Sequence, residues 1–243
     1  MENEANLASD GKVWYSVLDT VMKIPGAKVD RRAFLKNNFS KYYDDDKLSV
    51  ILEEGTGRAG VPIEIMDKVA DRVISYHLTW VTLISAGLGF PGGFALIGTI
   101  PTDLAQYFLH TFQVAQKLAY VYGYPDLDEG SDDDLKTMIT LFVGVMFGVA
   151  AANAAIKAVA KMFAQATVKR LSSMALTKTT IYPIVKQIAR VLGIQLTKKK
   201  FAEWVGKKLI PIISAGISGG ITWATFLPNA KRLKKKLRED IIT

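Results

Sequence analysis

Five polar side chains recur at helical spacing in a segment that is apolar on most sides: Asp103, Gln106, His110, Gln113 and Lys117. Residues three or four positions apart lie on the same face of a helix, so these five form one row. A buried polar group without a partner costs about 1–3 kcal/mol. We therefore expect the row to meet solvent, a hydrogen-bonded network or a ligand.

His77, the only histidine besides His110, precedes the row on what we expect to be the neighbouring helix. An internal hydrogen-bonded network is the commonest use of such groups. The second interpretation is a pocket for the polar head of an amphipathic ligand. The third is a metal or acid–base site built from the two histidines and nearby carboxylates. The candidate ligand-binding residues are Asp103, Gln106, His110, Gln113 and His77.

Other enzyme motifs are absent or incomplete. Gly55–Gly60 matches the glycine pattern of a dinucleotide-binding loop, but Trp80 stands where an acidic residue is required. The acidic run Asp126–Asp134 lacks the glycine and glutamate positions of an EF-hand and suits the first turn of a helix. The chain has no Cys, no Gly-x-Ser-x-Gly elbow and no phosphate-binding loop. The sequence thus favours a non-enzymatic protein, with no catalytic residue, metal or cofactor expected.

Apolar residues follow a helical period along nearly the whole chain, and no run alternates with the period of a strand. We expect an all-α fold, a single multi-helix bundle with Gly-rich central apolar helices. Residues 1–65 would form an N-terminal helical extension and residues 66–243 the main helical domain. Asp103 is expected to cap its helix. The expected helices span residues 13–23, 31–42, 44–54, 62 to beyond 78, 103–122, 133–171, 181–192, 199–208 and 211–236.

Charge is unequally divided along the 243 residues, whose net charge is +8. Before Lys157 there are 13 basic and 20 acidic side chains, and from Lys157 on there are 18 basic and 3 acidic ones. Such asymmetry indicates an anionic partner, or a bipolar domain whose two parts face each other. Because Trp and aliphatic residues accompany the cations, anionic lipid or a membrane protein is favoured over nucleic acid. The candidate surface consists of Lys198, Lys199, Lys200, Lys207, Lys208, Lys231, Arg232, Lys234, Lys235, Lys236 and Arg238.

Three stretches without charge are about as long as a membrane-spanning helix: Leu78–Thr102, Thr137–Ile156 and Leu209–Ala230. Basic residues on both sides of the last stretch argue against three crossings. We expect buried helices in a globular or membrane-adhering bundle, while a model with two crossings stays open. The acidic first residues do not resemble a secretory signal. We therefore expect a cytoplasmic protein, peripheral at the inner face of the cell membrane.

Two segments resemble the EcsC family. Thr99–Asp103, then Gln113, then Ala119–Tyr124 are similar to its "IP-x-D … Q … YGY" core, and the Gly-rich segment from Pro211 to Pro228 resembles its C-terminal part. The resemblance covers residues 67–237, and a related pattern occurs in helical domains of bacterial dynamin-like GTPases. It implies an all-α bacterial protein in the cytoplasm or at the inner membrane, and supplies no catalytic residue.

Three functions follow as hypotheses. The first is a non-enzymatic, peripheral membrane-associated adaptor or regulator that binds anionic lipid or a membrane protein. The second is a carrier or sensor of an amphipathic, lipid-like ligand whose head lies near the polar row. The third is a metal-dependent hydrolase that uses His77 and His110.

Overall fold

The computed structural model describes residues 14–83, 102–165, 181–191 and 211–243, with the side chains of residues 102–104 and 211–223 left out. Over these ranges the chain forms nine helices and no strand, which confirms the expected all-α bundle. The helices are residues 14–22, α2 (Arg31–Phe39), α3 (Asp45–Glu54), α4 (Ile63–Leu83), α5 (Thr102–Val121), α6 (Asp132–Met146), α7 (Ala150–Ala164), residues 181–191 and α9 (Pro211–Glu239).

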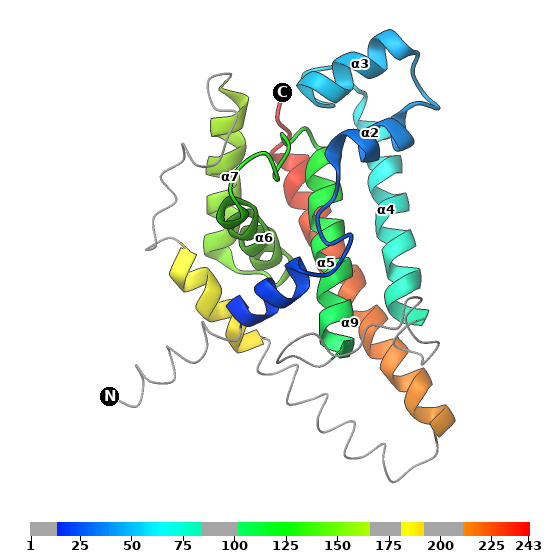
Figure 1. Cartoon of the computed structure of the whole chain (residues 1–243), viewed down its shortest axis with the longest axis vertical. Coiled ribbons are helices and arrows are strands. Elements are labelled where there is room, and N and C mark those ends of the chain that lie inside the picture. The colour runs from blue at the N-terminus through cyan, green and yellow to red at the C-terminus, as the bar shows by residue number, and fades with distance from the viewer. Residues whose placement is uncertain (1–13, 84–101, 166–180, 192–210) are drawn as a thin grey trace.

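Helix α5 lies at the centre of the bundle, where it packs against α4, α6 and α9 (Figure 1). Its sequence is apolar on most sides, and Phe108, Phe112 and Leu118 are fully buried. A helix that is apolar nearly all round is stable only where neighbours cover it on several sides. Helix α4 also packs against α9, so α4, α5 and α9 form a three-helix centre, and α7 packs on α6.

Local capping explains where several helices begin. The Asp44 side chain accepts a hydrogen bond from the Lys47 backbone N–H at the start of α3, which satisfies one of the donors that a helix start leaves free. Ser131 and Asp134 form a reciprocal capping box at the start of α6. The last three residues of the acidic run, Asp132–Asp134, therefore lie in the first turn of a helix, as expected, and Asp126, Asp128 and Glu129 precede that helix. Gly55–Gly60 lies in the connection between α3 and α4.

One of the expected helices has wrong boundaries. The helix expected over residues 133–171 is divided into α6 and α7 at Gly148, whose φ of 77° is incompatible with a continuing right-handed helix. Helix α5 is described from Thr102 on, and because the side chain of Asp103 is not described, its expected capping role stays a prediction. The uncharged stretch from 137 to 156 consequently lies in two shorter helices. The helix expected over residues 199–208 lies outside the described residues.

The N-terminal residues share the hydrophobic core with the rest of the chain. Trp14 is fully buried, and its indole ring makes edge contacts with Phe108 and Phe112 of α5. Its N–H donates a hydrogen bond of 3.0 Å to the Thr140 hydroxyl of α6. One aromatic side chain thus ties the helix of residues 14–22 to both α5 and α6. The division of the chain at residue 65 stays a prediction.

Candidate functional site

A chain of three basic side chains crosses the interface between α4 and α5. The Lys117 Nζ atom lies 2.8 Å from Nε2 of His77, and Nδ1 of His77 lies 3.0 Å from Nδ1 of His110. His77 projects from the buried face of α4, whereas His110 and Lys117 lie two turns apart on α5. Two members of the row predicted on α5, His110 and Lys117, are therefore in contact with His77 of α4.

Burial keeps both imidazoles neutral near pH 7. His77 is 1% exposed and His110 is 8% exposed. Burial, together with the nearby charge of Lys117, lowers the pKa of His110 to about 4 and holds the pKa of His77 well below its usual value. Burial also lowers the pKa of Lys117 to about 8. At pH 7 the site thus holds two neutral rings and an ammonium group that is still mostly protonated.

The charge on Lys117 fixes the direction of every hydrogen bond in the chain. An ammonium group only donates, so Nε2 of His77 must accept. The single ring proton of His77 is then on Nδ1 and donates to Nδ1 of His110. The proton of His110 is consequently on Nε2, an atom that is buried and has no hydrogen-bond partner among the described residues. The charge on Lys117 thus determines the tautomer of His110, the last of the three side chains. His110 thereby presents an N–H donor that no described residue accepts.

Gln106 adds a second unpaired polar group one turn from His110 on α5. The residue is 9% exposed, and its Oε1 atom has no hydrogen-bond partner in the part of the chain that the structure describes. The amide can turn to present either oxygen or nitrogen. Since each buried group without a partner costs about 1–3 kcal/mol, two of them on one helix face indicate a site that is completed by something other than the described residues.

The other members of the predicted row lie elsewhere. Gln113 donates a hydrogen bond of 2.7 Å to the Gly26 carbonyl and fastens the chain after the first helix. Gln116, which the sequence reading did not single out, has the same kind of role, because it accepts from the Val29 N–H and donates to the Ala27 carbonyl. The side chain of Asp103 lies outside the described residues. The row thus divides into a structural part and a site around His110.

The metal interpretation is not supported at this site. Within the described ranges, no group of three or more His, Cys, Asp or Glu side chains is placed to hold a metal ion. The third group beside the two imidazoles is the Lys117 ammonium, whose charge repels a divalent cation.

The basic residues at the end of α9 are largely engaged by carboxylates of the same chain. Lys234 lies 2.7 Å from Asp71 and 3.7 Å from Asp67 of α4, and the Arg238 Nε atom lies 2.9 Å from Asp67. Acidic and basic parts of the chain therefore face each other here, as in a bipolar domain. Most of this charge is neutralised within the molecule.

The remaining members of the predicted basic surface differ in exposure. Lys236 pairs with Asp240, and Lys235 lies 4.0 Å from Glu239. Arg232 donates to the Met146 carbonyl at the end of α6. Lys231 is exposed and has no ion-pair partner in the described part of the chain. The members that lie outside the described residues are Lys198, Lys199, Lys200, Lys207 and Lys208.

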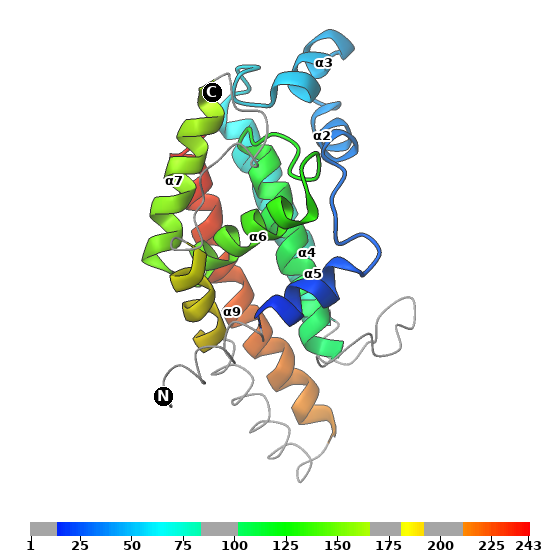
Figure 2. The same cartoon turned by 60° about the vertical axis from the view of Figure 1, so that its left-hand side comes forward.

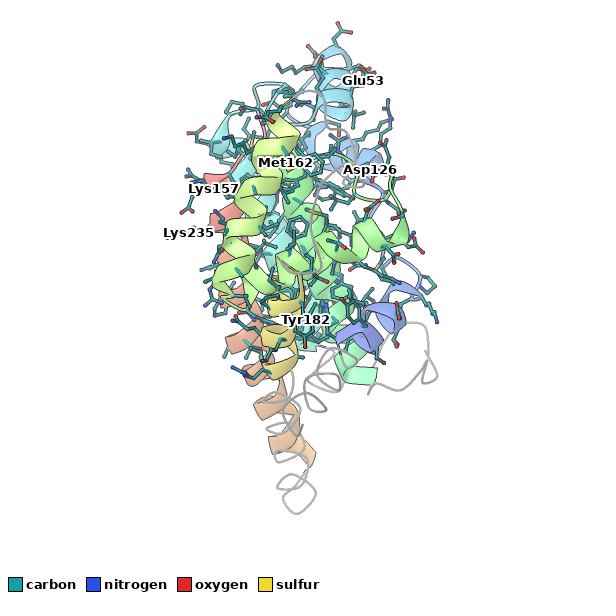
Figure 3. The ribbon with its side chains drawn as sticks, turned by 90° about the vertical axis from the view of Figure 1, so that its left-hand side faces the viewer. Glu53, Asp126, Lys157, Met162, Tyr182 and Lys235 are labelled. Carbon is teal, nitrogen blue, oxygen red and sulfur yellow. The ribbon has the colours of Figure 1, made fainter. Side chains whose placement is uncertain are left out.

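Three helix segments without a charged residue lie at one end of the bundle. The end of α4, the start of α5 and the start of α9 lie together there, and α9 extends beyond the other two (Figures 1 and 2). We call this the apolar end and define it by residues 73–83, 104–116 and 211–230, which contain no Asp, Glu, Lys or Arg. The opposite end carries α2 and α3, including the labelled Glu53 (Figure 3).

The described surface of the apolar end exposes large side chains on α4. Tyr76 is 57% exposed and Leu83 is 39% exposed. Trp80 lies between them with its ring 6.3 Å from that of Tyr76. Spacings of three and four residues place all three on one helix face. Among the described helices, none is both long enough and apolar enough to cross a membrane.

No protein-family model matches the chain, and neither a curated protein nor a solved structure does. The resemblance to the EcsC family therefore stays a prediction. Its Tyr-Gly-Tyr element has a structural role here, since Tyr122 and Tyr124 are fully buried at the end of α5. Gly123 has a φ of 91°, and a Cβ atom at this residue would lie 2.6 Å from the Ile242 carbonyl oxygen. Only glycine suits that position.

We expect Lys117→Met to stabilise the protein and to change how stability depends on pH. The pKa of Lys117 is about 8 in the folded state, against 10.5 for a free side chain. The unfolded chain therefore binds more protons between these values, and stability rises with pH across this window. At pH 7 the full cost of the buried charge, up to about 3 kcal/mol, is present. Methionine keeps the apolar stem and removes this cost.

Urea unfolding at pH 7 and at pH 9.5 measures the effect. The unfolding free energy of the variant should exceed that of the wild type by about 1–3 kcal/mol at pH 7, and the difference should narrow at pH 9.5. The exposed Lys68 of α4 provides the matched control, because Lys68→Met removes the same charge at the surface. If Lys117→Met and Lys68→Met changed the unfolding free energy equally, the claim that burial of the Lys117 charge destabilises the protein would be wrong.

Proposed function

We propose that the protein is a non-enzymatic, peripheral membrane-associated adaptor or regulator whose apolar end contacts anionic lipid. The observation that carries the proposal is the convergence of three uncharged helix segments at one end of the bundle, with Tyr76, Trp80 and Leu83 on its described surface. An apolar surface of this kind marks an interaction site for a membrane or a protein. Tyr and Trp are the side chains that suit the boundary between head groups and acyl chains.

The preference for anionic lipid rests on the sequence that leads into this end. Lys207 and Lys208 stand four and three residues before Pro211, the first residue of α9, and Lys198–Lys200 precede them. Cations beside an apolar helix contribute about 1 kcal/mol each at an anionic surface. The cluster at the end of α9 does not carry the proposal, because Lys234 and Arg238 are paired with carboxylates of α4.

Vesicle flotation tests the proposal. The protein should float with vesicles that contain phosphatidylglycerol and remain partly bound after a high-salt wash, since apolar contacts are not screened by salt. Vesicles of phosphatidylcholine alone should bind it more weakly. If the protein binds neither kind of vesicle at low salt, the proposal is wrong. Binding only to native membranes, abolished by stripping them with protease, would instead identify a membrane protein as the partner.

A second function, a carrier or sensor of an amphipathic ligand, is favoured by one observation. His110 and Gln106 are nine-tenths buried and lie on the α5 segment of the apolar end, and each has an atom without a hydrogen-bond partner in the described part of the chain. Polar atoms of this kind in an apolar surrounding are typical of a site that orients a ligand head group.

A further inference from the structure

We propose that His110 Nε2–H and the Gln106 amide bind the carboxylate head of a long-chain fatty acid, and that Lys117 acts through His77 to orient the donor. This inference rests on the second function, that of a carrier or sensor, and assigns its ligand class and the residues that recognise it.

The first step is the identity of the unpaired group. The distances from Lys117 to His77 and from His77 to His110 are those of hydrogen bonds. Because the ammonium cannot accept, the chain of bonds runs in one direction and ends in a donor on His110. The atom that completes the site must therefore be an acceptor, such as an oxygen. Gln106 can offer an N–H of its own amide to a second oxygen.

The second step is the charge of the ligand. Lys117 lies deep enough for burial to lower its pKa, and no carboxylate is paired with it among the described residues. The groups that face it from α4 are His77 and the ring of Tyr76, whose centroid lies 5.9 Å away. No charged side chain of α2, α6 or α9 is bonded to it in the described ranges. Lys117 is thus a buried cation without a paired carboxylate among the described residues, and it orients the N–H donor of His110. A ligand with one negative charge would both accept from this donor and offset the buried positive charge.

The third step is the apolar part of the ligand. The residues next to the two recognition groups on α5 are Ala105, Phe108 and Leu109, all buried and apolar. Gln106 lies within the apolar end, near the point where α5 begins beside the end of α4 (Figure 1). A head group at His110 would consequently place its chain among uncharged side chains. A carboxylate on a long hydrocarbon chain has both properties.

The four side chains have different tasks. His110 and Gln106 touch the carboxylate, whereas His77 and Lys117 are positioning residues. When Lys117 loses its proton, its amine can accept from Nε2–H of His77, and each imidazole then takes the opposite tautomer. Nε2 of His110 becomes an acceptor and repels the carboxylate. Binding should accordingly weaken as the pH rises through about 8, the pKa of Lys117.

Calorimetric titration with oleate tests the site, and ring ¹⁵N spectra of the same samples report the tautomers. With only two histidines in the chain, the spectrum should show Nδ1–H on His77 and Nε2–H on His110 at pH 7. His110→Phe and Gln106→Leu should each weaken oleate binding at least about 10-fold, the loss of one charge-assisted bond. Lys117→Met should weaken it about 5-fold or more, remove its pH dependence and abolish the fixed tautomers, whereas Lys68→Met should change none of these.

Two results overturn the inference, and they differ in what else they refute. If wild-type protein shows no saturable oleate binding, the carrier function fails as well, and the unpaired atoms bind water only. If oleate binds but His110→Phe and Gln106→Leu leave its affinity unchanged, the carrier function survives and the site assigned here is wrong. Neither result depends on vesicle flotation, so the membrane proposal is tested separately.

Discussion

Replacing Tyr76 and Leu83 with glutamate will lower the partition of the protein onto vesicles that contain phosphatidylglycerol by more than about 100-fold. Each substitution removes a side chain whose burial contributes about 1.5–3 kcal/mol. Each also brings a carboxylate to an anionic surface, which opposes binding by about 1 kcal/mol. Both residues are exposed in the structure, so the folded state should tolerate the change. Sedimentation of vesicles over a range of lipid concentrations measures the partition coefficient.

The chain contains a matched control at the opposite end of the bundle. Tyr42 and Val50 are 36% and 38% exposed, and they lie beside α2 and on α3. Tyr42→Glu combined with Val50→Glu replaces one tyrosine and one aliphatic residue and adds two negative charges, as the Tyr76→Glu, Leu83→Glu variant does. This control should change the partition less than about 10-fold, since only the long-range effect of its charge remains. Equal losses in the two double variants would show that net charge, and not the apolar end, governs binding.

Trp14→Ala will destabilise the protein by about 3–5 kcal/mol, the range for deleting a fully buried aromatic side chain. The indole fills the space between the first helix, α5 and α6, where it contacts Phe108 and Phe112 and donates to Thr140. The Thr140 hydroxyl keeps its own bond to the Lys136 carbonyl, so most of the loss comes from packing. Chemical unfolding followed by circular dichroism at pH 7 measures it.

Trp14→Phe tests whether the stability lost in Trp14→Ala comes from the loss of packed aromatic volume. Phenylalanine restores part of the aromatic volume, so this variant should lose about half as much stability as Trp14→Ala. Tyr15 is the neighbouring control because it is 48% exposed, and Tyr15→Ala should cost less than about 0.5–1 kcal/mol. A loss below 1 kcal/mol for Trp14→Ala would mean that residues 14–22 are not part of the core.

Local chemistry made the helices predictable. The Asp30 side chain caps α2 by accepting from the Ala33 N–H, and Asp132–Asp134 at the end of the acidic run lie in the first turn of α6, as such residues do at helix starts. The division between α6 and α7 was not predictable in the same way. A glycine within an apolar run is compatible with a continuous helix. What separates the two helices is that α7 turns back to pack on α6, where a Cβ on Gly144 would lie 2.7 Å from Ala152 Cβ.

The candidate site was predictable only in part. Helical spacing put His110 and Lys117 on one face, because that relation lies within a single element. The bond between His77 and His110 depends on how α4 and α5 are aligned, which no local pattern specifies. The same is true of Lys234 and Asp71, which are 163 residues apart in the chain. The sequence shows a cluster of cations there, whereas the fold supplies their carboxylate partners.

A single label at the apolar end tests the central claim most directly. The chain contains no cysteine, so Leu83→Cys and Glu53→Cys each provide one attachment point for an environment-sensitive NBD fluorophore, at opposite ends of the bundle. On addition of vesicles that contain phosphatidylglycerol, the emission of the label at residue 83 should shift to the blue and increase, while that at residue 53 stays unchanged. An unchanged spectrum at residue 83 with protein bound to the vesicles would contradict the account, as would a shift confined to residue 53.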